Sequence, residues 1–305
     1  MQKVLITGIA GGLGRLIATR LAGRVPVVGA DVRSWANPPS GVEIHRADLR
    51  KRRFEDLVRT ERPDAVVHLG FIRHFRGDAR ERHRTNVGGT KLLLDHCVKY
   101  GVRQLVVLSS SYVYGALPEN PYRLEEDAPL SGSRAYPEIR DLVEVDTLAS
   151  SFIWRRPEVV TCVLRPVNVL GPNVESMVRE YLSLARIPTV LGFDPMMSFI
   201  HEDDLADAIL LAAQRELRGV YNIDGAGAVP LHTAIRETGG TAWPIPEPPA
   251  AWLFRRMFRW GLLPYPAGML DFMKYPVSLS GERFVRATGF RCKYGLREIF
   301  DSVSR

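Results

Sequence analysis

The sequence predicts an α/β protein built on a doubly wound parallel sheet, followed by a smaller lobe. A strand, a glycine-rich turn and a helix are indicated within residues 4–22, at the start of the chain. Short apolar runs then alternate with longer amphipathic segments as far as residue 172, which is typical of a parallel sheet covered by helices. The alternation stops after Gly171 and Pro172, where we expect the smaller lobe to begin.

The first strand and helix flank the turn at residues 7–14, with the sequence TGIAGGLG. Residues 4–6 form an apolar run short enough for a buried strand, and the apolar positions of 15–22 recur at helical spacing. Glycines in such a turn permit a tight bend, let backbone amides approach a pyrophosphate and let the helix pack closely on the strand. A second strand, 25–30, ends at Asp31, whose carboxylate can accept hydrogen bonds from an adenosine ribose. We therefore predict a nucleotide cofactor site; the alternative is a glycine-rich turn that merely connects the two elements.

The elements that follow continue the alternation up to residue 172. Strands are expected at residues 42–45, 64–70, 104–108 and 159–164, and helices at 51–60, 78–100 and 138–154. Gly101 is expected to end the second of these helices. Repeated units of this kind place ligands at the carboxyl ends of the strands.

The final third has a different pattern. Short helices are expected at residues 174–185 and 203–214, with a small strand at 220–223 and a proline-rich stretch at 244–249. We expect a cofactor domain in residues 1–172, with return segments at about 198–224. Residues 173–305 are expected to form mainly a substrate-binding lobe.

Composition limits the remaining classes. The net charge is +7, but no nucleic-acid-binding motif accompanies it, so we expect no nucleic acid partner and assign most of the arginines to a solvated surface. The three cysteines lie far apart without a CxxC motif, which favours free thiols in a reducing compartment over disulfides or a zinc site. No apolar run of 18 residues is present, and no signal peptide is expected before the first strand. We expect a cytoplasmic protein.

Seven motifs follow one another along the chain. They are TGIAGGLG at residues 7–14, Asp48-Leu49, His68-Leu69-Gly70, TNVGGT at 85–90, SSSYVYG at 109–115, LRPVNVLGP at 164–172 and FIHEDD at 199–204. In this order and with these separations they resemble the motifs of the extended short-chain dehydrogenase/reductase family. That family includes nucleotide-sugar epimerases and dehydratases and 3β-hydroxysteroid-type dehydrogenases. The resemblance covers residues 1–223 and implies a Rossmann-type sheet, a substrate-binding C-terminal lobe and a homodimer through two helices of the cofactor domain.

The resemblance implies a catalytic serine and a catalytic tyrosine. The serine is Ser110, whose hydroxyl would orient the oxygen of the substrate for proton transfer. The tyrosine is Tyr136, at the family's YxxxK motif, in which Arg140 replaces the lysine. This spacing puts both side chains on one helix face, where a fixed cation favours the phenolate. Arginine does not readily lose a proton, however, and Pro137 pushes Tyr136 toward extended backbone. The alternative is an inactive tyrosine in a protein that only binds its cofactor.

The resemblance also implies which residues bind the dinucleotide. They are Gly8, Gly11, Gly12, Leu13, Gly14, Asp31, Arg33, Asp48, Leu49, Leu69, Gly70, Phe71, Asn86, Tyr136, Arg140, Pro166 and Val167. A carboxylate at Asp31 bonds the ribose of NAD and repels the 2′-phosphate of NADP, whereas Arg33 could accept that phosphate. We expect NAD, with NADP as the alternative, and no metal ion.

Two features of the lobe bear on the substrate. Nucleotide-sugar members of the family usually carry an arginine for the substrate diphosphate where this chain has Met197, which argues against such a substrate unless another arginine of the lobe serves. His201, in the FIHEDD motif, is expected to be structural. Residues 251–263 form a basic amphipathic helix with an apolar stripe, and three roles are open: core packing, a lid over an apolar substrate, or contact with a membrane surface.

We therefore expect an NAD(P)-dependent oxidoreductase acting on a secondary alcohol or ketone of a small apolar molecule. Ser110 would orient the oxygen, Tyr136 would exchange its proton and Arg140 would stabilise the phenolate. An epimerase or dehydratase with internal hydride return is the alternative within the enzyme class. A cofactor-binding scaffold or sensor that has lost its chemistry is the alternative outside it.

Overall fold

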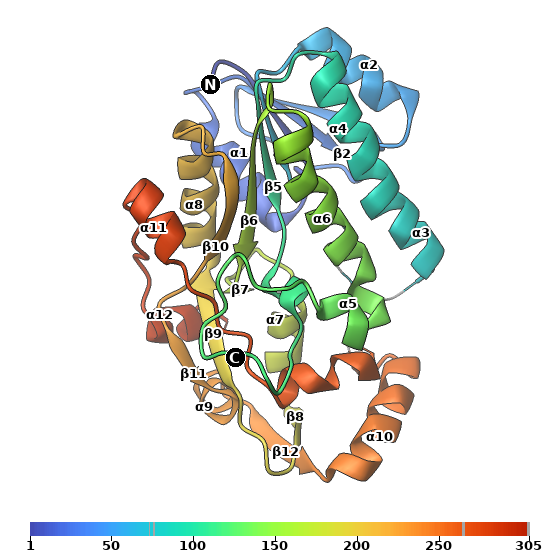
Figure 1. Ribbon diagram of the computed structural model, residues 1–305, viewed down its shortest axis with the longest axis vertical. Helices are drawn as coiled ribbons and strands as arrows, with labels where there is room; N and C mark the ends of the chain where they lie inside the picture. The colour runs from blue at the N-terminus through green and yellow to red at the C-terminus, as the bar shows by residue number, and fades with distance from the viewer. Residues whose placement is uncertain (73, 76, 264–265, 304–305) are drawn as a thin grey trace.

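Apolar runs form the centre of the fold because helices cover both faces of the sheet that they build. The computed structural model describes residues 1–72, 74–75, 77–263 and 266–303. Its largest sheet has seven strands in the order β10-β6-β5-β4-β1-β2-β3, and neighbouring strands are parallel. The strands are β1 (Val4–Thr7), β2 (Val27–Asp31), β3 (Val42–Arg46), β4 (Ala65–His68), β5 (Gln104–Leu108), β6 (Val160–Pro166) and β10 (Gly219–Ile223). This doubly wound sheet confirms the predicted fold class (Figure 1).

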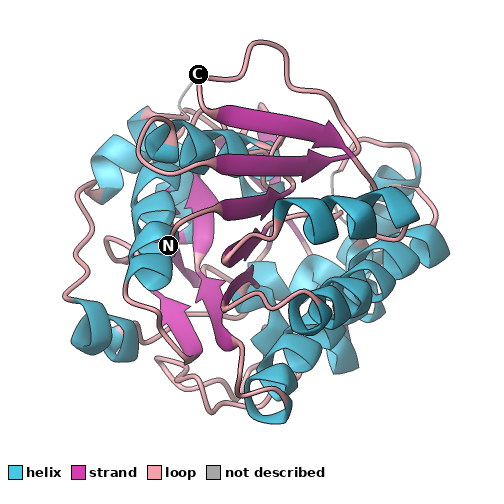
Figure 2. Ribbon diagram, turned by 90° about the horizontal axis from the view of Figure 1, so that it is seen from above, coloured by secondary structure: helices cyan, strands magenta, loops and turns pink. Residues whose placement is uncertain are grey.

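Alternate residues of each strand supply two apolar clusters, one on each face of this sheet. Val106 belongs to the cluster under α1 (Gly12–Leu21) and α8 (Glu202–Gln214), while its neighbour Val107 belongs to the other. Figure 2 shows helices on both sides of the strands. The second face is covered by α2 (Arg52–Glu61), α4 (Gly89–Lys99) and α6 (Arg140–Arg155).

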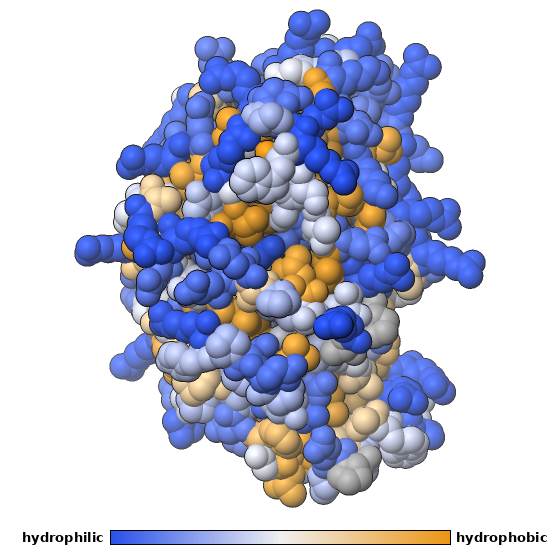
Figure 3. Space-filling view, in the orientation of Figure 1, coloured by the Kyte–Doolittle hydropathy of each residue, from blue (hydrophilic) through white to orange (hydrophobic). Residues whose placement is uncertain are grey.

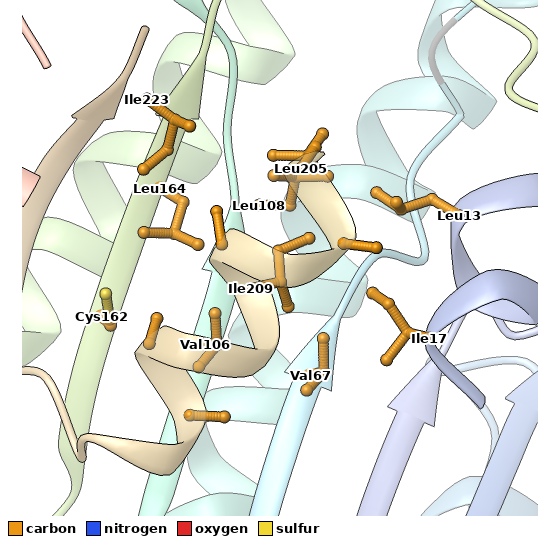
Figure 4. Close-up of a cluster of buried hydrophobic side chains, with 14 of the residues drawn as sticks. Leu13, Ile17, Val67, Val106, Leu108, Cys162, Leu164, Leu205, Ile209 and Ile223 are labelled. Carbon is orange, nitrogen blue, oxygen red and sulfur yellow. The ribbon is translucent and has the colours of Figure 1, made fainter. Parts of the chain in front are cut away.

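The packing of α8 on the sheet is shown in Figure 4. Leu205 and Ile209 of this helix lie over Val106 and Leu164, and Ile17 of α1 lies beside them. At the rim, Arg20 of α1 binds the carboxylates of Asp203 and Asp207 on α8. The helix from the return segment is therefore fixed to the helix that follows the glycine turn.

The lower half of Figure 1 is a lobe at the carboxyl ends of the central strands. Its two small sheets are formed by β7 (Asn168–Leu170), β9 (Met196–His201) and β11 (Ala228–Pro230), and by β8 (Arg186–Val190) and β12 (Thr241–Ile245). Its helices are α7 (Met177–Leu182), α9 (Leu231–Glu237), α10 (Glu247–Arg259), the 3₁₀ segment η4 (Ala267–Met273) and α12 (Leu296–Asp301), whereas α11 (Glu282–Thr288) lies beside β10, where its Phe284 joins the cluster under α8. A separate apolar cluster joins the elements of the lobe, and Tyr136 belongs to that cluster.

Three predicted elements differ from the structure. The single helix expected at 78–100 is divided into α3 (Ala79–His83), a π-helical turn η1 (Arg84–Gly88) and α4. The helix expected at 174–185 is shorter, and the chain enters the unpredicted strand β8 after it. The proline-rich stretch forms a strand and the start of a helix. Pro244 lies in β12, which pairs with β8 alone among the described strands, and a strand at a sheet edge tolerates proline. The prolines that follow lie in the first turn of α10, where proline is also tolerated.

Candidate functional site

The glycine turn lies between β1 and α1, as predicted. Gly8 has φ of +73°, and a Cβ there would stand 2.8 Å from the backbone of Gly70. A Cβ on Gly12 would stand 1.9 Å from the carbonyl oxygen of Asn173. No acidic residue occupies the first turn of α1, whose amide groups and dipole favour an anion. The turn has the shape and charge that a pyrophosphate requires.

Asp31 lies at the carboxyl end of β2, beside this turn. Its buried carboxylate accepts hydrogen bonds from the backbone N–H of Ala10 (3.0 Å) and of Arg33 (2.9 Å). The Arg33 guanidinium extends back over the turn, because its Nη2 lies 3.3 Å from the place of a Cβ on Gly11. An acid suited to a ribose and a cation suited to a phosphate therefore lie side by side, and their roles toward a cofactor stay predictions.

The Asp48–Leu49 pair follows β3. The Arg50 guanidinium binds the Asp48 carboxylate at 2.7 Å and keeps the pKa of Asp48 below its usual range. The same guanidinium reaches Glu81 at 2.6 Å. Leu49 is buried against Gly89 of α4.

The loop after β4 is held by Asn86. The side-chain amide accepts a hydrogen bond from the N–H of Ile72 (2.8 Å) and donates one to its carbonyl (2.9 Å). Asn86 therefore positions the Leu69–Phe71 loop, and both polar atoms of its side chain are already used. Phe71 lies on the ring of His68, with centroids 4.2 Å apart.

Leu13, Pro166 and Val167 are buried. The Leu13 side chain enters the core beside Ile17, as Figure 4 shows, so only its backbone faces the turn. Val167 donates its N–H to Ile223 of β10 at 3.0 Å. The roles of these three residues toward a cofactor stay predictions.

The loop over Gly12 is fixed by a residue that sequence reasoning missed. Glu202 is buried, and its carboxylate accepts hydrogen bonds from the N–H groups of Asn173 (3.0 Å) and Val174 (2.7 Å). The FIHEDD motif has glutamate where the family pattern has valine, and this departure was the available signal. His201, next to it, accepts from the N–H of Asp203 and caps α8, which confirms its structural position.

Ser110 lies at the carboxyl end of the neighbouring strand β5. Its hydroxyl accepts a hydrogen bond from the N–H of Tyr112 at 3.3 Å, and the side chain is partly exposed. Ser109 points the other way and donates to the buried Asp146 at 2.5 Å. Arg165 forms an ion pair with the same Asp146 at 2.6 Å. Ser110 therefore has a hydroxyl available for a ligand, whereas Ser109 belongs to a buried ionic network that the sequence had not indicated.

Tyr136 is in place but enclosed. Its side chain is 1% exposed, and its hydroxyl donates to the carbonyl of Ala116 at 3.1 Å. The ring of Phe272 lies against it, with centroids 5.0 Å apart. Burial, and then the negative charge of Asp271, raise the pKa of Tyr136 above its usual value.

The expectation that Tyr136 and Arg140 share one helix face is wrong, while the role of Arg140 toward the phenolate and a cofactor stays a prediction. Tyr136 has extended backbone (φ −133°, ψ 92°) because Pro137 follows it, and α6 begins only at Arg140. The two residues therefore do not share a helix face. The Arg140 side chain is 69% exposed and pairs with Glu144 at 2.7 Å.

The surroundings of Tyr136 come largely from the lobe. Phe272 of η4 contacts both Tyr136 and Tyr112, while Met269 and Leu270 of the same segment belong to the same apolar cluster. Met197, in place of the family arginine, packs against this cluster as well. Figure 3 shows apolar side chains exposed in the middle of this face, between the sheet and the lobe.

The one group of possible metal ligands found in the described ranges lies elsewhere. Glu43 and His45 of the outermost strand β3 and Glu61 at the end of α2 place their ligand atoms within 4.8 Å of one another. Glu43 is exposed, and exposed acidic groups commonly gather without an ion.

Comparison with known proteins now identifies the family. A model of the NAD dependent epimerase/dehydratase family matches residues 4–224. The chain belongs to this family. The match spans the glycine turn, Ser110, Tyr136 and strand β10, so the epimerase/dehydratase family resemblance predicted from the motifs is confirmed.

The relatives of this chain include an uncharacterised protein, a dehydratase and a protein named as a reductase. An uncharacterised protein of Mycobacterium tuberculosis is 30% identical over 80% of this chain and 68% of its own length. A dTDP-glucose 4,6-dehydratase of Streptomyces griseus is 29% identical over 79% of each chain. A protein of a Streptomyces species named 3-diazoavenalumate denitrifying reductase is 28% identical over 73% of this chain and 75% of its own.

Solved structures of epimerases and dehydratases share the fold. The UDP-glucose 4-epimerase of Thermus thermophilus, in complex with NAD, superposes with a TM-score of 0.78 at 23% identity, covering 99% of this chain and 97% of that one. The dTDP-glucose 4,6-dehydratase of Bacillus anthracis, in complex with NAD, gives 0.76 at 16% identity, covering 99% and 96%. The likeness therefore extends through the lobe, beyond the segment that the family model matches.

Proposed function

We propose that this protein is an NAD-dependent oxidoreductase that reduces a ketone, or oxidises the matching secondary alcohol, on a small apolar molecule. The observation that carries the proposal is the environment of Tyr136. Its ring is surrounded by aromatic and aliphatic side chains of the lobe. Met197, which replaces the arginine that nucleotide-sugar members of the family usually carry, packs against the same cluster.

The cofactor would lie along the carboxyl ends of the central strands. The N-terminus of α1 would hold its pyrophosphate, and Asp31 would bind its adenosine ribose. Arg33 would bind the pyrophosphate of NAD, or the 2′-phosphate if NADP is used. When bound, the nicotinamide supplies the hydride chemistry.

The residues of the chain would handle the proton. Ser110 would donate a hydrogen bond to the substrate oxygen, and Tyr136 would give that oxygen its phenolic proton as the carbonyl becomes an alcohol. A tyrosine with the ordinary pKa of about 10 is already protonated at neutral pH, and burial raises the pKa of Tyr136 further, which favours the phenol over the phenolate. The phenol is the form that the reductive direction needs. A relative that bears the name of a reductase supports the same direction.

The present position of η4 closes the site. Phe272 covers the ring of Tyr136, so the substrate would displace Phe272 and lie against Tyr112 and Tyr136. If Phe272 moves away, the space that it vacates is lined with apolar groups. That lining favours a substrate with an apolar surface.

A second candidate is a cofactor-binding scaffold that has lost its chemistry. It is favoured by the exposed position of Arg140 and by the hydrogen bond that occupies the Tyr136 hydroxyl. A third, an epimerase or dehydratase, is favoured by the names of the relatives.

The deciding experiment follows nicotinamide absorbance with NADH and NADPH against ketones that range from sugars to steroids and long-chain compounds. We expect apolar ketones to be reduced, and Tyr136→Phe to lower kcat by about a hundredfold or more while the affinity for NADH stays within about twofold. Unchanged turnover in Tyr136→Phe would exclude the mechanism. Binding of NADH without turnover on the whole panel would favour the scaffold, and conversion of a nucleotide sugar without net absorbance change would favour the epimerase or dehydratase.

A further inference from the structure

The outward face of α10 combines arginine and tryptophan. Its residues Trp252, Arg255, Arg256 and Arg259 are exposed, and so are Trp260, directly after the helix, and Leu262. We call these six residues the Trp–Arg face. Trp252 is 60% exposed, Trp260 59% and Leu262 57%. Exposed large apolar side chains in one patch indicate a contact surface.

Packing within the protein does not account for this face. The opposite side of α10 already supplies the core, where Phe254 is fully buried and Leu253, Met257 and Phe258 pack on the lobe cluster. The expected apolar stripe is therefore core, but Trp260 lies with the arginines and not beside the stripe. The tryptophans are additional to the core contacts of the helix.

The two indoles are ordered by one guanidinium. Arg256 lies over the ring of Trp252 at 5.1 Å and over that of Trp260 at 4.6 Å, one helical turn to each side. Cation–π contacts of this kind hold flat groups side by side. The result is a platform about two turns long in which cations and indoles alternate.

The charged side chains of this platform are all positive. Residues 248–270 contain three arginines and no acidic residue. The one acid of α10, Glu247, lies at the start of the helix and pairs with Lys274 at 2.9 Å. Figure 3 shows hydrophilic side chains projecting at the lower right, over α10.

We propose that the Trp–Arg face docks on a bilayer rich in anionic phospholipid, with α10 parallel to the bilayer surface. Tryptophan prefers the headgroup level of a bilayer, and guanidinium groups bind phosphate in two-point hydrogen bonds. A helix of this length extends about 20 Å, so several headgroups would be bound at once. None of the helices in the described residues has the length and apolar content to span a bilayer, so the contact is one with the surface.

The proposal does not depend on the proposed function, although the two meet in the lobe. The inner face of α10 packs on the cluster that contains Tyr136 and η4. Docking would therefore bring the lobe that covers Tyr136 to the lipid. Binding to vesicles can be measured without any turnover, so the failure of one proposal leaves the other open.

The test uses sedimentation of the full chain with vesicles of phosphatidylcholine alone or with about 30% phosphatidylglycerol. We expect binding to the anionic vesicles only, weakened by salt, with a blue shift of tryptophan emission. Arg255→Gln, Arg256→Gln and Arg259→Gln combined should weaken binding by about tenfold or more, and Trp252→Ser with Trp260→Ser should abolish the blue shift.

Matched variants separate the face from total charge. Arg24, Arg53 and Arg297 are exposed on other elements, so the combination Arg24→Gln, Arg53→Gln and Arg297→Gln removes the same charge elsewhere and should retain binding within about twofold. Circular dichroism checks that each variant is folded. Equal loss in both triple variants, or no binding of the unmodified protein to anionic vesicles, would overturn the proposal. So would binding of the face to nucleic acid or to another protein in place of lipid.

Discussion

The ring of Phe272 lies against the ring of Tyr136, tilted by 42°, and the two centroids lie 5.0 Å apart. The same side chain meets Tyr112 edge-on at 4.8 Å. Phe272 belongs to the lobe, whereas Tyr136 precedes α6 of the sheet half. Access to the phenol is thus controlled by a segment distant in sequence.

Phe272→Ala should open Tyr136 to reagents. We expect faster nitration of Tyr136 by tetranitromethane, followed by mass spectrometry, and a loss of about 2 kcal/mol in unfolding free energy, because the ring is only partly buried. Phe193→Ala is the control, since Phe193 is partly buried in the same lobe but meets Tyr275 edge-on. Equal nitration of Tyr136 in both variants would show that Phe272 does not cover it.

Arg140→Gln should have little effect on either stability or chemistry. The guanidinium is 69% exposed and pairs with Glu144 on its own helix, and such pairs contribute about 0.5 kcal/mol or less. We expect kcat and the affinity for NADH to stay within about twofold of the unmodified protein. A tenfold fall in either would mean that Arg140 reaches the cofactor in the bound state.

The cofactor half could be predicted from sequence because its signals are local. The glycine turn, Asp31 and the alternation of strands and helices each depend on a few neighbouring residues, and the structure has them where they were expected. Element ends differ by a few residues, as at the π-helical turn before α4.

The surroundings of Tyr136 could not be predicted in the same way. A four-residue spacing indicates a shared helix face only if both residues are helical, and Pro137 prevents this for Tyr136. The cover provided by Phe272 joins segments far apart in the chain, so no local pattern indicates it. Arg82 is likewise buried in an ion pair with Asp141, a residue far along the chain.

Asp146→Asn should be strongly destabilising. Asp146 and Arg165 are both nearly inaccessible, and removal of one charge leaves the other buried without its partner, at a cost of about 3 to 5 kcal/mol. Urea unfolding measures this, and Glu144→Gln, two residues away on the surface of α6, should change stability by less than about 1 kcal/mol. The double variant Asp146→Leu with Arg165→Met should lose less than the sum of the single losses; strict additivity would contradict a direct coupling.

Gly12→Ala should weaken cofactor binding as well as stability. The new methyl would meet the Asn173 carbonyl at 1.9 Å, so either the turn or the loop that Glu202 holds must move. Gly88→Ala is the control, because Gly88 has helical backbone (φ −63°) and open space around the position of its Cβ. We expect a loss of NADH affinity of about tenfold or more for Gly12→Ala and none for Gly88→Ala. Equal NADH affinities of the two variants would mean that the glycine turn does not bind the cofactor.

Because of Tyr136, the free energy of unfolding should decrease as the pH rises above about 10. Its pKa in the folded state is raised above the usual value of about 10, so above pH 10 the unfolded chain loses this proton first and unfolding becomes more favourable. The contribution is complete below pH 10 and is lost as the pH rises toward the folded pKa. Unfolding in urea at pH 8 and at pH 11 measures the decrease in unfolding free energy between the two pH values. We expect this decrease to be about 1 kcal/mol smaller in Tyr136→Phe than in the unmodified protein. Tyr122→Phe, at a side chain 73% exposed, should leave the decrease unchanged, and an identical pH dependence in all three proteins would mean that Tyr136 is already solvated in the folded state.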